Sequence, residues 1–154
     1  MKKHFAFTLI ELIIALAIVL IAVSVTAVSY RFENADKQIQ YEAESLSHWF
    51  SERMALADSF SASWTLYISY GDNNERNLRL QWNTGPMCGK YERYELATAC
   101  RLMEVSGTSG STVYSGEWHT MTPALTVTVY PPEGMTAQKY RKVVVSGQGY
   151  VSIQ

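Results

Sequence analysis

The sequence predicts an α+β protein in which one long N-terminal helix packs on a small antiparallel β domain. Glycine and proline, which interrupt helices, are absent before Gly71, and all nine glycines and four prolines lie from there onward. Before that point the chain combines an apolar run with a helical apolar stripe, and after it short segments alternate polar with apolar residues. A chain of 154 residues has room for one such helix and one such domain.

The first element is an apolar segment, residues 7–30, that contains one charged residue, Glu11. A helix of this length is about 36 Å long, which exceeds a hydrocarbon core of about 30 Å. Lys2 and Lys3 precede the segment and Arg31 follows it among acidic residues, so the positive-inside rule predicts a cytoplasmic N-terminus. We therefore expect a single membrane-spanning helix with the rest of the chain outside the cytoplasm.

Glu11 is the unusual residue of this segment. A carboxylate in hydrocarbon costs roughly 2.5–3.5 kcal/mol on insertion scales, so it requires a partner, and nothing else in the run can neutralise it. One interpretation is an ordinary signal anchor whose Glu11 lies near the cytoplasmic headgroups. A cleaved secretory signal fits less well, because its apolar core has only about 7–15 residues.

A second interpretation comes from the residues around Glu11. The sequence Ala-Phe-Thr-Leu-Ile-Glu-Leu at residues 6–12, behind a basic leader, resembles the processing site of type IV prepilins and type II secretion pseudopilins. The resemblance implies that a prepilin peptidase removes residues 1–6 by cutting between Ala6 and Phe7, and that Phe7 is then N-methylated. Ala6 stands where this family usually has glycine. Prepilin peptidase/methyltransferase, other pilin subunits and an inner-membrane assembly platform are the implied partners.

Cleavage would also supply the missing partner of Glu11. The resemblance implies that Glu11 pairs during assembly with the new amine of Phe7, mainly that of a neighbouring subunit. Two charges that are each costly in lipid become tolerable when they are paired. We therefore expect Glu11 to set the register between subunits in residues 7–30, which would form the transmembrane and filament-core helix.

The helix is predicted to continue through residues 31–57 as an amphipathic segment. Apolar residues recur there at steps of three or four, which places them on one face that we expect to pack in the core. The stripe consists of Phe32, Ala35, Ile39, Ala43, Leu46, Phe50 and Met54. The other faces are assigned to the charged residues Glu33, Asp36, Lys37, Glu42, Glu44 and Glu52.

Residues 58–154 are predicted to form the periplasmic or extracellular β domain. Alternation with period two and intervening turn residues indicate an antiparallel sheet, in one or two layers, against the helix stripe. The expected strands are 64–70, 77–82, 101–105, 124–130, 142–146 and 150–153. This layout resembles that of the GspH/FimT-type minor pseudopilins. The uninterrupted first helix likewise favours a minor over a major subunit.

Two cysteines and three histidines limit the disulfide, catalytic and metal-binding chemistry that the chain can support. Cys88 and Cys100 both fall in the outer domain, where an even count favours a disulfide worth on the order of 3 kcal/mol. His4, His48 and His119 are far apart in the sequence, and no nucleophile motif or phosphate loop accompanies them. The acidic turn after Gly71 lacks the ligand spacing of a calcium loop. We expect no catalysis, no metal and no cofactor.

Nucleic-acid binding is an alternative for the outer domain. From Arg31 onward the chain has eleven Lys and Arg residues and thirteen Asp and Glu residues, so its net charge does not attract phosphates. Lys139, Arg141 and Lys142 form the one basic cluster, which is typical of a charge-protected strand edge. DNA-binding FimT-type subunits resemble one another in an arginine near the C-terminal glycine turn. This chain has none there, which argues against DNA binding.

The sequence thus predicts a minor pilin or pseudopilin, processed and added to a type IV pilus or type II secretion pseudopilus. It would serve filament initiation or assembly in protein secretion, adhesion or DNA uptake. The expected location is the bacterial inner membrane, single-pass, with the C-terminal domain in the periplasm. Two alternatives stay open: a signal-anchored extracytoplasmic binding module, and a DNA-binding minor pilin of a competence filament.

Overall fold

The computed structural model of the protein describes residues 9–71, 76–108, 110–133 and 139–154, with the backbone alone for residues 25–32. The chain divides into two compact units, Met1–Ala35 and Asp36–Gln154. The predicted α+β class is confirmed, because a long helix is followed by nine antiparallel strands in the described residues.

The helix α1 spans Leu9–Ser59, 51 residues that include parts of both units. It ends two residues beyond the expected end at residue 57, where Ala62 N donates to the carbonyl of Ala57 (2.8 Å) and the chain turns into the first strand. Within the residues that the structure describes, no helix combines the length and apolarity needed to cross a membrane.

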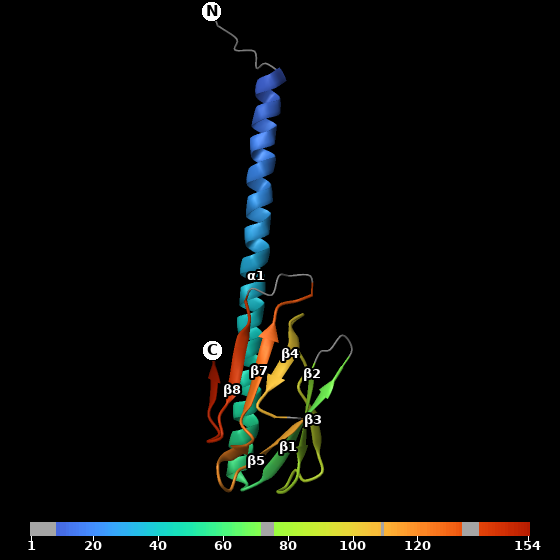
Figure 1. The fold of residues 1–154 in the computed structure, drawn as a ribbon, viewed down its shortest axis with the longest axis vertical. Helices are drawn as coiled ribbons and strands as arrows, with labels where there is room; N and C mark the ends of the chain where they lie inside the picture. The colour runs from blue at the N-terminus through green and yellow to red at the C-terminus, as the bar shows by residue number, and fades with distance from the viewer. Residues whose placement is uncertain (1–8, 72–75, 109, 134–138) are drawn as a thin grey trace, which may run out of the picture. The chain divides into compact units, whose positions relative to one another are not determined.

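Nine strands form two antiparallel sheets in the second unit (Figure 1). The five-stranded sheet has the order β3-β2-β1-β5-β6 and the four-stranded sheet the order β4-β7-β8-β9. The first sheet comprises β1 (Ser63–Tyr70), β2 (Arg76–Trp82), β3 (Tyr91–Arg93), β5 (Ser111–Ser115) and β6 (Thr120–Thr122). The second comprises β4 (Arg101–Ser106), β7 (Leu125–Tyr130), β8 (Arg141–Val145) and β9 (Val151–Ile153).

The predicted hairpins are present in these sheets. β1 pairs with β2 in a register that sets Trp64 opposite Trp82 and Leu66 opposite Leu80, so the apolar residues share one face. β8 pairs with β9 across the Gly147–Gly149 turn, in which Ser146 N donates to the carbonyl of Tyr150 (2.8 Å). The short strands β3, β5 and β6 were not among the expected strands.

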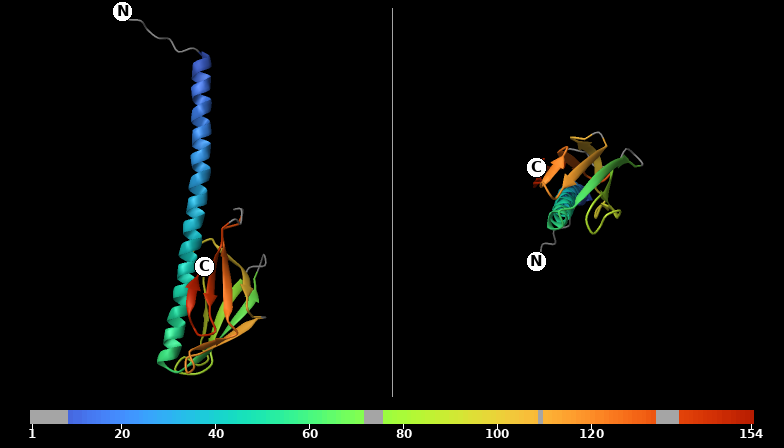
Figure 2. Two further views of the ribbon diagram at one scale, coloured as in Figure 1. Left: turned by 60° about the vertical axis from the view of Figure 1, so that its left-hand side comes forward. Right: turned by 90° about the horizontal axis from the view of Figure 1, so that it is seen from below.

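The hydrophobic core lies between the inner faces of the sheets and the helical segment of residues 36–59. Both views of Figure 2 show the strands gathered along one side of that segment. The predicted stripe is confirmed there, because Ile39, Ala43, Leu46, Phe50 and Met54 are buried. Every member of the core cluster lies between Ile39 and Val145. The second unit therefore contains a complete core of its own.

Aromatic residues fill much of this core. Trp64 and Trp82 are fully buried, and Trp64 stacks on Tyr114 with ring centroids 5.3 Å apart. Trp118, by contrast, is 71% exposed in the turn between β5 and β6. Gly116, in the same turn, approaches the helix end so closely that a Cβ atom there would lie 2.3 Å from the carbonyl oxygen of Ala57.

Candidate functional site

The N-terminal part of α1 presents a continuous apolar surface. Every large apolar side chain described from Leu9 to Val23 is at least 53% exposed. An apolar surface of this kind marks a contact with lipid or protein, since soluble monomers rarely leave one uncovered. Side chains one helical turn apart also enclose a shallow apolar groove of about 280 Å³, lined by Leu12, Ile13, Leu16, Ala17 and Leu20.

Glu11 lies on this surface, in the first turn of α1, and is exposed. A carboxylate in the first turn interacts favourably with the helix dipole, because the amide groups there have no partners within the helix. Its helical neighbours, Leu12 and Ile14 among them, are apolar and exposed. The proposed cleavage residues Ala6 and Phe7 lie outside the described residues.

In the outer domain the structure corrects the placement of Glu42. The helical stripe assigned it to an outer polar face, but its side chain is fully buried. The carboxylate accepts hydrogen bonds from Tyr94 Oη (2.5 Å), Thr98 N (2.9 Å) and Thr98 Oγ1 (2.7 Å), with Ala97 N at 3.3 Å. Glu42 therefore fixes the loop between β3 and β4 to the helix. Burial, and next the hydrogen bond to Glu42, raise the pKa of Tyr94 well above its usual value.

The basic cluster at the start of β8 is also in contact with the helix. Lys139 Nζ lies 3.2 Å from Asp36 Oδ2, and an Arg141 guanidinium nitrogen lies 3.8 Å from Asp36 Oδ1. Lys142 instead places its ammonium over the ring of Tyr140, 5.6 Å from the centroid. Two of the three candidate DNA-contacting cations thus face a carboxylate of the same chain, which reduces the positive potential available to phosphate.

The expected Cys88–Cys100 disulfide is not formed in the structure, in which both cysteines are free. Cys88 is exposed in the turn after β2, where its Sγ donates to the carbonyl of Asn83 (3.0 Å). Cys100 is buried in the core. Burial raises the pKa of the Cys100 thiol, which keeps it protonated and unreactive.

The described histidines and acidic residues do not converge on a metal. Across the described residues, no group of three or more His, Cys, Asp or Glu side chains could hold an ion. His48 is exposed on α1, and His119 Nδ1 contacts Asp58 Oδ1 at 3.0 Å. Tyr114 Oη donates to the same oxygen (2.7 Å), so this group joins the β5–β6 turn to the helix end. His4 and Asp72 lie outside the described residues.

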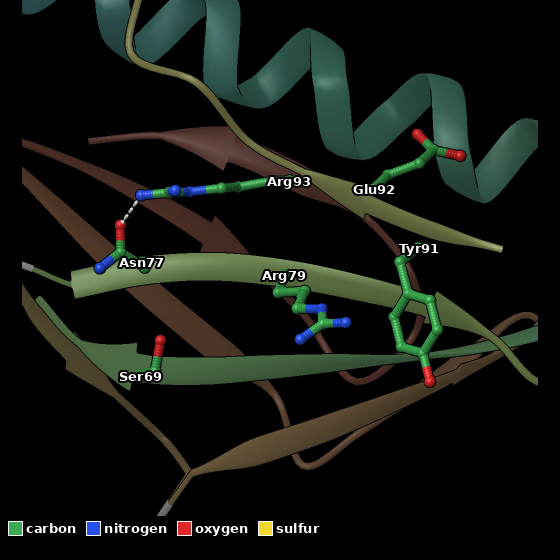
Figure 3. A pocket seen from close by; sticks show the side chains of 6 residues that line it. All are labelled: Ser69, Asn77, Arg79, Tyr91, Glu92 and Arg93. Atoms are coloured by element: carbon green, nitrogen blue, oxygen red, sulfur yellow. Dashed lines mark hydrogen bonds between the residues drawn. The ribbon is translucent and has the colours of Figure 1, made fainter.

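A groove of about 390 Å³ lies on the outer side of the five-stranded sheet (Figure 3). Arg79, Tyr91 and Arg93 line it together with Ser69, Asn77 and Glu92. The Arg79 guanidinium stacks on the ring of Tyr91, 4.2 Å from the centroid, and Arg93 donates to Asn77 Oδ1. Sequence reasoning did not single out these arginines, because their proximity depends on the pairing of β2 with β3.

Comparison with known proteins adds one finding. Residues 1–27 match the family described as "Prokaryotic N-terminal methylation motif". Neither a curated protein nor a solved structure matches the chain. The match supports a type IV pilin-like or pseudopilin-like subunit, and proteins with this motif are structural subunits rather than enzymes. It covers the basic leader, the residues around the expected cleavage point and most of the apolar segment.

Proposed function

We propose that the chain is a minor pilin or pseudopilin, a structural subunit of a type IV pilus or type II secretion pseudopilus. The observation that carries this proposal is the methylation motif at residues 1–27. The motif overlaps the part of α1 whose apolar side chains are exposed and among which Glu11 is the one carboxylate. A subunit that is held in the membrane and then assembled requires both a processing motif and an apolar surface that contacts first lipid and then other subunits.

In this proposal prepilin peptidase cuts between Ala6 and Phe7, Phe7 is methylated, and the helix is held in the inner membrane until assembly. Glu11 then pairs with the Phe7 amine of a neighbouring subunit. The outer domain stays on the periplasmic side and contacts other subunits. The minor role, in the manner of the GspH/FimT-type subunits, is supported by the uninterrupted helix and by the two small sheets.

The mature N-terminus tests the proposal. Mass spectrometry of the chain purified from its producing bacterium should identify an N-terminal methylated Phe7 and the loss of residues 1–6. An intact leader, or a cut beyond residue 20, would instead support a signal-anchored or secreted binding module. A chain that is cut after Ala6 but carries an unmethylated amine would support the peptidase step and refute the methylation step.

A substitution tests the role of Glu11. Glu11→Ala should leave processing unchanged, because the peptidase acts before the apolar run, but it should reduce incorporation into filaments. Glu33→Ala removes the same carboxylate from an exposed position beyond the run and serves as the matched control. Incorporation of Glu11→Ala at the control level would contradict the pairing.

DNA reception has less support. The ion pairs of Lys139 and Arg141 with Asp36 give these two cations a role within the fold. A gel shift with the domain of residues 36–154 should therefore show no salt-sensitive binding of duplex DNA. Binding that disappears on replacing Lys139, Arg141 and Lys142 by glutamine would reinstate the competence-filament alternative.

A further inference from the structure

The outer face of β1, β2 and β3 carries a row of basic and aromatic residues that is typical of a binding surface. Tyr67 on β1 lies opposite Arg79 on β2, and Arg79 lies opposite Arg93 on β3. Because Leu78 and Leu80 are buried in the core, the alternate positions of β2 point outward. In Figure 3, Arg79, Tyr91 and Arg93 lie on the outer side of the sheet, whereas Glu92 points toward the helix. We call Tyr67, Arg79, Tyr91 and Arg93 the basic face.

The two arginines of the basic face form an unfavourable cross-strand pair. Tyr94 N donates to the carbonyl of Leu78, which makes 78 and 94 a hydrogen-bonded pair. The adjacent pair Arg79–Arg93 is then non-hydrogen-bonded, the kind whose Cα atoms lie only about 4.5 Å apart. Like charges directly opposite each other destabilise a sheet. A bound anionic group would compensate for this repulsion.

No carboxylate of the described residues supplies that compensation. The ion pairs formed there involve neither Arg79 nor Arg93. Glu92 lines the groove, but its two oxygens bind Arg53 Nε (3.0 Å) and Trp82 Nε1 (2.8 Å) on the inner side. The stacking of Arg79 on Tyr91 and the bond from Arg93 to Asn77 hold both guanidinium groups close to the sheet. The positive charge is therefore held in place and available to a ligand outside the domain.

The composition of this face indicates a protein ligand. Its outward residues are Tyr, Arg, Ser, Thr, Asn and Gln, without Lys, Asp or Glu. Tyr and Arg are enriched at protein interfaces and Lys, Asp and Glu are depleted. Two cations would neutralise only about two phosphates, which is few for a nucleic-acid groove. Tyr67 and Tyr91, at 43% and 53% exposed, add apolar area to the contact.

A surface of complementary charge lies on the same domain. Glu44 and Glu52 are exposed two helical turns apart on α1. Glu52 and Glu95 line a shallow groove of about 340 Å³ beside the helix, together with Arg53 and, at its edge with the basic face, Arg93. Glu44 and Glu95 take part in none of the ion pairs of the described residues, whereas Glu52 pairs with Arg53. We call Glu44, Glu52 and Glu95 the acidic patch.

We propose that the basic face of one copy docks on the acidic patch of a second copy of this chain. Arg93 lines both grooves, so the two surfaces adjoin, yet within one copy its guanidinium is not paired with a carboxylate. Because the two surfaces differ, the contact is heterologous and leaves each copy one surface free for a further subunit. This inference rests on the proposed filament role and names a contact that the outer domain makes in it.

Site-specific photo-cross-linking of the full-length chain in its producing bacterium tests the contact. A benzophenone amino acid placed at Gln81, which lies opposite Tyr91 on the outer face, should give a covalent dimer. Peptide mapping should locate the cross-link in residues 44–53 or 94–101 of the second copy. A cross-link to another protein or to nucleic acid, or no cross-link, would overturn the proposal.

Charge reversal supplies the sharper test. Arg79→Glu with Arg93→Glu, or Glu44→Lys with Glu95→Lys, should lower the dimer yield by at least about fivefold, because each removes the attraction and adds repulsion. Producing both double variants together should restore a mixed dimer, which misfolded chains could not form. Lys142→Glu reverses a charge on the other sheet without breaking an ion pair of the described residues, and it should leave the yield unchanged.

Unchanged yield after either reversal, or no recovery in the mixture, would refute the charge pairing. The N-terminal mass measured on the same samples separates this failure from that of the proposed function. A processed Phe7 terminus without the cross-link would refute only the contact between outer domains. An unprocessed chain would refute the filament role itself.

Discussion

Replacing Glu42 by alanine should destabilise the outer domain, because its carboxylate holds the loop between β3 and β4 to the helix. The carboxylate is fully buried and accepts three hydrogen bonds of 2.5–2.9 Å from Tyr94 and Thr98. Removing it takes the side-chain acceptor from these donors and opens a cavity beneath the loop.

The magnitude follows from what each donor can find instead. An unsatisfied buried donor costs about 1–3 kcal/mol, and the cavity left by the side chain adds to this loss. Thr98 is only half-buried, so water can reach its groups once the loop relaxes, whereas the buried Tyr94 hydroxyl keeps only the long bond to the backbone carbonyl of residue 42 (3.5 Å). We therefore expect a loss of about 3 kcal/mol. For a domain of this size that lowers Tm by roughly 12 °C.

Urea unfolding of residues 36–154, followed by tryptophan fluorescence, measures this loss. The fragment contains the whole core cluster, and Trp49 lies 5.6 Å from Tyr94 between ring centroids, so it reports on the site. Glu44→Ala removes an exposed carboxylate two residues away and should change stability by less than about 0.5 kcal/mol. A loss below about 1 kcal/mol for Glu42→Ala, or an equal loss for the control, would refute the reasoning.

Three further predictions concern the same fragment. Burial, followed by bonds to carboxylates, raises the pKa of Tyr94 and Tyr114, so above about pH 10 the folded state holds protons that the unfolded state releases. The free energy of unfolding should then fall as pH rises, by up to about 2.7 kcal/mol per pH unit for the two groups together. Chemical denaturation that gave equal free energies of unfolding at pH 9 and pH 11 would contradict this. Gly116→Ala should cost about 2 kcal/mol or more, because its Cβ would overlap backbone atoms of the helix end, whereas Gly147→Ala meets nothing closer than 3.6 Å; thermal melting compares the two. In the intact fragment the exposed Cys88 thiol should react with iodoacetamide and the buried thiol only after denaturation, and a native mass about 2 Da lower, without labelling, would establish the disulfide instead.

Much of the fold could be predicted because the relevant signals are local. The helical stripe from Ile39 to Met54 and the period-two segments around Trp64 and Trp82 each reflect one buried face, and a buried face repeats at the period of its element. The missed strands, such as β3 and β6, have three residues each, too few for a period to be recognised.

The features that could not be predicted depend on contacts between distant parts of the chain. Glu42 looks like a surface residue in the helical pattern, and its burial depends on donors more than fifty residues away. The pair Arg79–Arg93 exists only in one strand register. The motif around Glu11, by contrast, is a continuous sequence, and it was found without any knowledge of the fold.

The confinement of the core cluster to residues between Ile39 and Val145 has a consequence for how this chain can change over time. Under the proposed function, substitutions among the first 35 residues affect processing and assembly, whereas substitutions in the second unit affect folding and surface contacts. A random mutational screen should therefore yield two separable classes of defect: folded chains that do not assemble, and chains degraded before assembly. The same separation would allow the outer domain to diverge or be exchanged while the N-terminal segment keeps its sequence.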